Sequence, residues 1–155
     1  MEKELQNHFT DSIFYEIELT AKYCKMLGAQ LFEDIDAGVT VDEFSALDTL
    51  LCNPELCQRD LAKLIFKDRA NTGKILDNLE SMGLIERHLS VKNNRPVKIS
   101  KLTPKGNQKV VEISQIINPH TEMIKSKIQN SDLKQLKTML KEFRNVLNDT
   151  LEIKI

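Results

Sequence analysis

Hydrophobic residues recur every three or four positions over most of this chain, which is the spacing of helices with one apolar face. The first such pattern predicts one long amphipathic helix over residues 5–34. Its apolar positions are Phe9, Ile13, Ile17, Cys24, Leu27 and Leu31. A second helix is predicted from Thr40, which forms a capping-box pattern with Glu43, and it ends near Asn53 and Pro54 because proline cannot continue a helix.

Two shorter helical patterns follow, separated by a turn at Phe66 and Lys67. The first is the segment CQRDLAKLI, at residues 57–65, which places its apolar residues on one side. The second is RANTGKILDNLESM, for which Asp68 is a good N-cap. Gly83 is well placed to end this second helix in a left-handed conformation.

The pattern then changes from helical to alternating. The segments LIERHLSV and VKISKLT are short, rich in β-branched residues and joined by the polar run KNNRP at residues 92–96. They predict a two-stranded hairpin with a basic tip. Thr103 and Pro104 open the next helix, as N-cap and first helical residue, and Pro119 is expected to interrupt or kink it.

The last segment has leucine-rich positions at alternating spacings of three and four, after a cap at Ser131 and Asp132. These positions are Leu133, Leu136, Leu140, Phe143 and Leu147. They amount to two heptads of a seam like that of a coiled coil. Because helices at both chain ends flank a middle portion that does not need them for its own core, the pattern favours helical dimerisation.

Length and composition are those of one domain with appendages. The chain has 155 residues, of which 41% are hydrophobic and 29% are charged, and this suits a folded core with a soluble surface. The N-terminus has no signal-peptide pattern, and no apolar run approaches the roughly 20 residues of a membrane span. We therefore expect a cytoplasmic protein that does not bind membranes.

Candidate chemistry is sparse. The three cysteines lack zinc-like spacing and the three histidines are scattered, so we expect no metal site. The chain contains no catalytic or nucleotide-binding motif, and we expect neither enzymatic activity nor a cofactor.

Charge is strongly segregated along the sequence, although the net charge is −1. Residues 1–57 carry 3 basic and 12 acidic residues, whereas residues 58–111 carry 12 basic and 5 acidic ones. Between Glu86 and Glu112 there are seven Lys and Arg and no acid. The acidic first third would repel DNA, so the basic middle is the predicted contact surface, with phosphates as its counter-charge.

The order of the predicted elements is that of a winged helix-turn-helix. The segment DRANTGKILDNLESMGLIER, with LTPKG downstream, resembles the MarR family of transcriptional regulators, and the resemblance covers nearly the whole chain. It implies a mainly α fold with a small β-hairpin wing. The DNA-binding domain would span residues 40–106, and helical dimerisation regions would span residues 1–36 and 108–155.

A helix that reads the major groove must carry hydrogen-bond donors on its exposed face. With Ile75, Leu76 and Leu79 turned inward, Arg69 and Lys74 can contact guanine or phosphate, and Asn71 can contact adenine. The complete set of predicted DNA-binding residues is Gln58, Lys63, Lys67, Arg69, Asn71, Lys74, Asn78, Lys92, Arg95 and Lys98. Gly73 either permits close approach to DNA or is merely tolerated.

The wing tip departs from the family pattern. Where the family commonly has an aspartate two residues before an arginine that enters the minor groove, this chain reads NNR. The resemblance implies minor-groove insertion for Arg95, whereas a gapless count back from Leu102 puts Pro96 at that position. Minor-groove reading of this kind senses groove width and A·T content.

These features predict a sequence-specific, homodimeric DNA-binding regulator, a repressor on a pseudo-palindromic operator. Release by a small ligand is what the resemblance implies, and oxidation is the alternative, with Cys52 and Cys57 as the candidate redox residues. The competing hypothesis is a winged helix used for protein contact without specific DNA binding.

Overall fold

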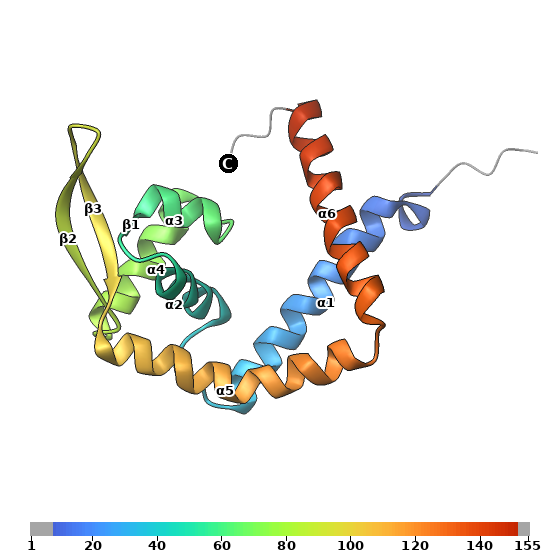
Figure 1. Ribbon diagram of the computed structural model, residues 1–155, viewed down its shortest axis with the longest axis horizontal. Helices are drawn as coiled ribbons and strands as arrows, with labels where there is room; N and C mark the ends of the chain where they lie inside the picture. The colour runs from blue at the N-terminus through green and yellow to red at the C-terminus, as the bar shows by residue number, and fades with distance from the viewer. Residues whose placement is uncertain (1–7, 152–155) are drawn as a thin grey trace, which may run out of the picture. The chain divides into compact units, whose positions relative to one another are not determined.

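The computed structural model describes residues 8–151, which are mainly helical (Figure 1). These residues contain six α-helices, one short 3-10 helix and three strands. The chain divides into two compact units, residues 1–41 and 42–155. Within the described range, none of the helices has the length and apolar character that a membrane span requires.

The first unit consists of a 3-10 helix, Phe9–Asp11, followed by the long helix α1, Ile13–Asp34. The sequence predicted one helix from residue 5, of which residues 5–7 lie outside the described range. The chain instead starts its α-helix at Ile13. Ser12 has an extended backbone, and its side-chain oxygen accepts a hydrogen bond from the Tyr15 N–H, so a serine N-cap sets the boundary.

The second unit holds a winged helix-turn-helix. Its elements are α2 (Val41–Cys52, which begins at the unit boundary), β1 (Leu56–Cys57), α3 (Gln58–Leu64), α4 (Arg69–Ser81), β2 (Ile85–Lys92) and β3 (Arg95–Leu102). They close around a core whose fully buried members include Leu47, Leu50, Leu61, Leu76, Leu79 and Ile85. The fold class is therefore as predicted, mainly α with a small β wing.

The predicted hairpin is present as β2 and β3, and a third strand, β1, extends it into a three-stranded sheet. β1 pairs antiparallel with β3, which gives the strand order β1-β3-β2. β2 and β3 pair as far as Lys92 with Arg95. Asn93 and Asn94 form the turn with φ of 51° and 57°, a left-handed conformation that asparagine tolerates and two-residue hairpin turns need.

The segment LTPKG fixes the start of helix α5, Pro104–Ser126, against the end of α4. Thr103 is the N-cap, as predicted, and its oxygen accepts from the Gly106 N–H and donates to the Gly83 carbonyl. Gly83 has a φ of 69° and ends α4 in the left-handed conformation expected of it. A Cβ at position 106 would lie 1.9 Å from the Leu84 carbonyl oxygen, so this position requires glycine.

Helix α5 continues through Pro119, which the sequence analysis expected to interrupt or kink it. A proline removes one backbone hydrogen bond of a helix, but the turns on either side keep theirs. Thr121 adds a side-chain hydrogen bond to the Asn118 carbonyl, 2.8 Å long, at this point of the helix. The helix is therefore not interrupted at Pro119, and the kink stays a prediction.

Helix α6, Asn130–Leu151, carries the predicted leucine seam. From residue 130 to residue 150, no residue of α6 is buried. Leu136 is 52% exposed, and the other four seam residues keep intermediate exposure. The apolar face of α6 thus remains partly accessible in the single chain.

Candidate nucleic-acid interface

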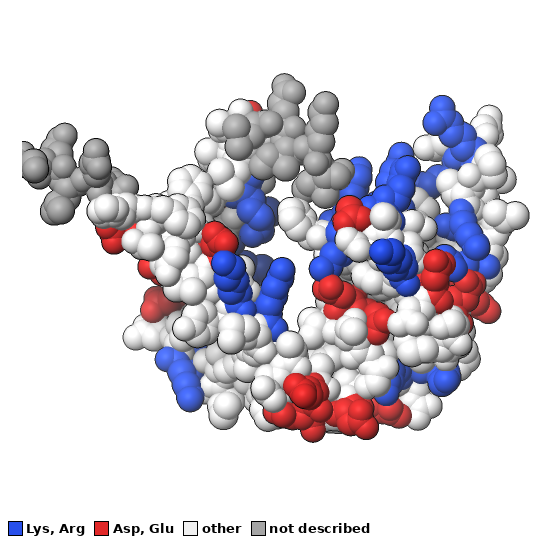
Figure 2. Space-filling model, turned by 180° about the vertical axis from the view of Figure 1, so that it is seen from behind, with Lys and Arg blue, Asp and Glu red and all other residues white. Residues whose placement is uncertain are grey.

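A basic cleft with a volume of about 600 Å³ opens beside the wing and the first turns of α3 and α4. Its lining residues are Cys57, Gln58, Arg59, Arg69, Lys92, Asn93, Arg95, Val97 and Lys98. Five of these nine residues are Lys or Arg and none is acidic. Lys and Arg side chains gather at the end of the unit that carries the wing tip (Figure 2). A concave surface of one sign of charge concentrates oppositely charged ligands.

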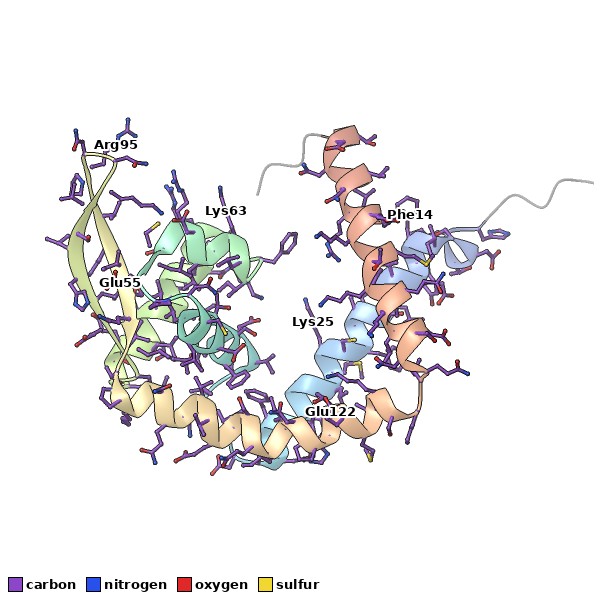
Figure 3. All side chains as sticks on the ribbon, viewed as in Figure 1. Phe14, Lys25, Glu55, Lys63, Arg95 and Glu122 are labelled. Atoms are coloured by element: carbon purple, nitrogen blue, oxygen red, sulfur yellow. The ribbon has the colours of Figure 1, made fainter. Side chains whose placement is uncertain are left out.

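Five of the ten predicted DNA-binding residues line this cleft, namely Gln58, Arg69, Lys92, Arg95 and Lys98. Lys63, Asn71 and Lys74 are exposed on α3 and α4 outside the lining. Figure 3 labels Arg95 at the wing tip and Lys63 on α3, both of which project from the second unit. Sequence reasoning missed Arg59 and Asn93. The position of Arg59 beside Gln58, in the first turn of the predicted helix, was the signal that could have identified it.

The N-terminus of α4 is organised by Asp68, the predicted N-cap. Its carboxylate accepts from the Asn71 backbone N–H at 2.8 Å and also from the Asn71 side-chain amide. The hydrogen bond from the Asn71 backbone holds the pKa of Asp68 below its ordinary value. The cap thus engages both the backbone and the side chain of Asn71, which is exposed at the start of the helix, one turn before Lys74.

The winged unit is also the part of the chain that matches a known family. Residues 39–97 match the sequence model of the MarR family. The winged unit of this chain is therefore a MarR-family domain. The match supports a winged helix-turn-helix, DNA-binding transcription regulator.

Solved MarR-family structures share the fold over most of this chain. MepR of S. aureus, in a complex with DNA, superposes with a TM-score of 0.75 and 22% identity, over 90% of this chain and 99% of that one. Wild-type MarR of E. coli in its apo form gives a TM-score of 0.66 at 21% identity, over 85% of this chain and 96% of the E. coli protein. PcaV of Streptomyces coelicolor, in complex with its natural ligand, gives a TM-score of 0.67 at 15% identity, over 81% of this chain and 89% of PcaV.

The basic run of this MarR-family chain is partly compensated within the protein, which corrects the expectation that phosphates alone are its counter-charge. Three of the seven cations between Glu86 and Glu112 have acidic partners within 4 Å. The pairs are Arg87 with Asp77 and Glu80, Lys92 with Asp60, and Lys101 with Glu55. The acids come from α3, α4 and the turn before β1, which are distant in sequence and adjacent in the fold.

Two of these pairs tie the wing to the helices. Arg87, whose side chain is 11% exposed, binds Asp77 and Glu80 of α4 at the base of β2, and Glu80 in particular raises its pKa. Nearer the tip, the Lys92 ammonium lies 2.7 Å from the Asp60 carboxylate of α3. Hydrogen bonds from Lys92 and from the Cys57 thiol lower the pKa of Asp60. The wing is therefore anchored at both its base and its tip.

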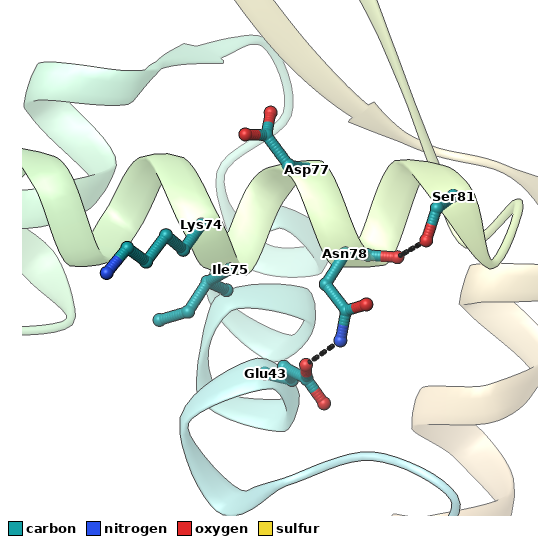
Figure 4. A pocket seen from close by; sticks show the side chains of 6 residues that line it. All are labelled: Glu43, Lys74, Ile75, Asp77, Asn78 and Ser81. Atoms are coloured by element: carbon teal, nitrogen blue, oxygen red, sulfur yellow. Dashed lines mark hydrogen bonds between the residues drawn. The ribbon is translucent and has the colours of Figure 1, made fainter.

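Two predicted DNA-binding residues have partners in α2. Lys67 lies 2.8 Å from the Asp42 carboxylate and is half-buried. The Asn78 amide donates to Glu43, whose side chain is buried (Figure 4). A buried carboxylate needs donors, so this amide serves the packing of α4 on α2, and a contact of Asn78 with DNA stays a prediction.

The other predicted cations have no salt bridge to any described residue. They are Lys63, Arg69, Lys74, Arg95 and Lys98. Lys105 donates to the Met82 carbonyl at the end of α4, 2.9 Å away, and so belongs to the α4–α5 junction. Among the predicted DNA-binding residues, the positive charge that no described acid pairs with therefore lies on α3, on the first half of α4 and on the wing.

The candidate redox residues differ in their surroundings. Cys57 is 9% exposed, is the N-cap residue of α3 and directs its thiol to Asp60, while Cys52 is exposed at the end of α2. Neither forms a disulfide. No group of three or more His, Cys, Asp or Glu side chains within the described range is placed to hold a metal ion.

Proposed function

We propose that this MarR-family regulator is a homodimeric repressor that binds a pseudo-palindromic operator through both of its winged units. The observation that carries the proposal is the cleft with five cations, which lies beside the exposed N-terminal half of α4. A helix of this kind enters the major groove, while flanking cations contact phosphates. The operator half-sites should then lie about one helical turn apart, or a multiple of it.

Within the proposed complex, α4 and the wing contact different grooves. Arg69, Asn71 and Lys74 are the exposed polar residues of α4 for base edges and nearby phosphates. Arg95 is the residue for the minor groove, because it directly follows the Asn93–Asn94 turn. Pro96, the alternative position, lies one residue further from the tip and has no donor.

Homodimerisation is supported by the apolar surface left on the helices of each unit. In the second unit, the exposed apolar residues of α5 and α6 are Val111, Ile116, Met123, Ile124, Leu136, Met139 and Val146. In the first unit they are Ile13, Phe14, Tyr23, Met26 and Leu27 on α1. Apolar helix faces of this extent are typical of subunit interfaces.

Release by a small effector is the regulatory part of the proposal. PcaV, which shares this fold, was solved with its natural ligand, and a bound ligand that prefers a non-binding conformation would shift the protein off DNA. Oxidation is the alternative trigger. Cys57 lines the cleft but is only 9% exposed, and this low exposure disfavours oxidation of its thiol.

Binding to DNA is tested by fluorescence anisotropy, with a labelled duplex from the region upstream of the protein's own gene and a shuffled duplex as control. The two clefts of a dimer offer ten cations, of which Asp60 partly offsets Lys92. If the dimer neutralises roughly 8 to 10 phosphates, a plot of the logarithm of the association constant against the logarithm of the salt concentration should have a slope of about −7 to −9. An affinity that does not change between low and physiological salt would reject DNA binding and favour the protein-contact alternative.

The dimer is tested by light scattering coupled to size-exclusion chromatography. Leu136→Lys on α6 should convert a dimer into a monomer and abolish high-affinity operator binding. Lys134→Ala, on an exposed α6 residue outside the seam, is the matched control and should remain dimeric. A wild-type monomer at micromolar concentration would contradict the dimer. Repression itself is tested with a reporter driven by the bound promoter, which should rise when the gene is deleted.

A further inference from the structure

A single side chain bridges the two helices of the helix-turn-helix. The Gln58 amide nitrogen, at the first residue of α3, donates to the Arg69 backbone carbonyl, at the first residue of α4, over 2.9 Å. The orientation of this amide follows from chemistry, since a carbonyl oxygen can accept but not donate. The NH₂ group of Gln58 must therefore face Arg69.

Glycine 73 provides the space for this bridge. In an α-helix the carbonyl of residue i accepts from the N–H of residue i+4, so the Arg69 carbonyl also faces Gly73. An amide that reaches this carbonyl from α3 must pass close to position 73. A Cβ there would lie 3.1 Å from the Gln58 amide nitrogen, which is a few tenths of an ångström nearer than ordinary contact.

The bridge lies beside the basic cleft, where the two helices begin. Gln58 and Arg69 both line the basic cleft. The Arg69 side chain is exposed and has no salt bridge to the described residues, so the direction in which it projects depends on how the first turn of α4 is held. The contact to the backbone of Arg69 holds that turn together with the Asp68 cap.

We propose that Gln58 and Gly73 form a lock that positions the first turn of α4, and with it Arg69, for base reading. Gln58 is then a positioning residue rather than a direct reader of DNA, and Gly73 leaves room for the Gln58 amide, which a Cβ would push by a few tenths of an ångström. The role in base reading rests on the proposed DNA-binding function. The lock itself does not, because it is a contact within the free protein.

A double-mutant cycle on the free protein tests the lock. Gly73→Ala in a Gln58→Ala background should raise Tm by about 2–4 °C, since alanine is the better helix former and the clash is gone. In the wild-type background the same change should give no rise or a fall. Gln135→Ala, on an exposed glutamine of α6, is the matched control background and should behave as wild type. If Gly73→Ala raises Tm equally in the wild-type and Gln58→Ala backgrounds, the lock is refuted.

The role in recognition is tested with a duplex that the wild-type protein selects from a random pool, against a shuffled duplex. Gln58→Ala and Gly73→Ala should each weaken binding to the selected duplex about fivefold to tenfold, the effect of roughly one hydrogen bond. Binding to the shuffled duplex should change less than twofold. The double variant should be no weaker than Gln58→Ala alone, because both changes disrupt one contact.

The outcomes separate the two claims. Equal losses on both duplexes, or losses that add in the double variant, would overturn the positioning role. If the wild-type protein selects no sequence, the proposed function fails, while the melting temperatures still decide whether the lock exists.

Discussion

Replacing Gly106 by alanine should destabilise the junction between α4 and α5. The added Cβ would meet the Leu84 carbonyl oxygen at 1.9 Å, where a carbon and an oxygen need about 3.3 Å, so the first turn of α5 must move by more than about 1 Å. Three hydrogen bonds depend on this turn staying in place. They join the Thr103 N–H to the Leu84 carbonyl, the Thr103 hydroxyl to Gly83, and Lys105 to the end of α4.

The expected loss follows from these contacts. Each hydrogen bond contributes about 1 kcal/mol net, which gives a loss of roughly 3 kcal/mol. Alanine in a helix gains back about 1 kcal/mol relative to glycine. A net destabilisation of about 2 kcal/mol should lower Tm by about 4–8 °C for a chain of this size.

Thermal unfolding followed by circular dichroism measures this change, with Gly28→Ala as the matched control. A Cβ at position 28, inside α1, would lie 3.5 Å from the nearest Val41 methyl, which is ordinary contact. The control should therefore gain about 2–4 °C from helix propensity alone. A Gly106→Ala protein that melts at or above the wild-type temperature would refute the steric argument.

Four further predictions concern the wing, its partner on α3 and the sheet. Arg95→Ala should weaken operator binding more than Lys92→Ala in anisotropy titrations, because Arg95 has no salt bridge to the described residues whereas Lys92 is paired with Asp60; equal losses would mean that the wing acts as diffuse charge. By NMR titration the pKa of Asp60 should lie below the ordinary aspartate value and rise towards it in Lys92→Ala. Because the pKa of Asp60 is lowered on folding, Asp60 stabilises the folded protein above about pH 4. This stabilisation disappears as the pH falls through the folded-state pKa of Asp60. In urea unfolding, the free energy of unfolding of Asp60→Asn should therefore fall less with decreasing pH than that of the wild-type protein. Ser100→Ala should raise Tm by about 2–4 °C, because the buried Ser100 hydroxyl has no hydrogen-bond partner among the described residues; a lower Tm would indicate that it has one.

Local signals carried most of the fold prediction. The caps at Asp68 and Thr103 and the left-handed Gly83 depend on near neighbours in the chain, and the structure has all three where the pattern placed them. β1 has two residues, too few for any periodicity, and pairs with a strand more than forty positions away. No local pattern could reveal it.

Prediction of the candidate site was limited by long-range pairing. Helical spacing correctly put Arg69 and Lys74 on an exposed face, but it gave no information on which acids fold against which cations. The Asp60–Lys92 and Glu43–Asn78 contacts join residues more than thirty positions apart. The role of Gly73 was likewise undecided, because its neighbour Gln58 lies on another helix.

The two acids that pair with basic residues at this surface have a consequence for how the protein would find its operator. Asp42 and Asp60 neutralise Lys67 and Lys92, two of the predicted phosphate-contacting cations. Non-specific binding to DNA is almost wholly electrostatic, and each cation removed lowers the dependence on salt by about 0.9. The protein should therefore leave random DNA sooner and sample more sites per unit time. These pairs lower the electrostatic part of both the specific and the non-specific affinity, whereas the proposed base contacts of Arg69 and Asn71 add to the specific affinity alone. A larger share of the specific affinity should therefore come from base reading.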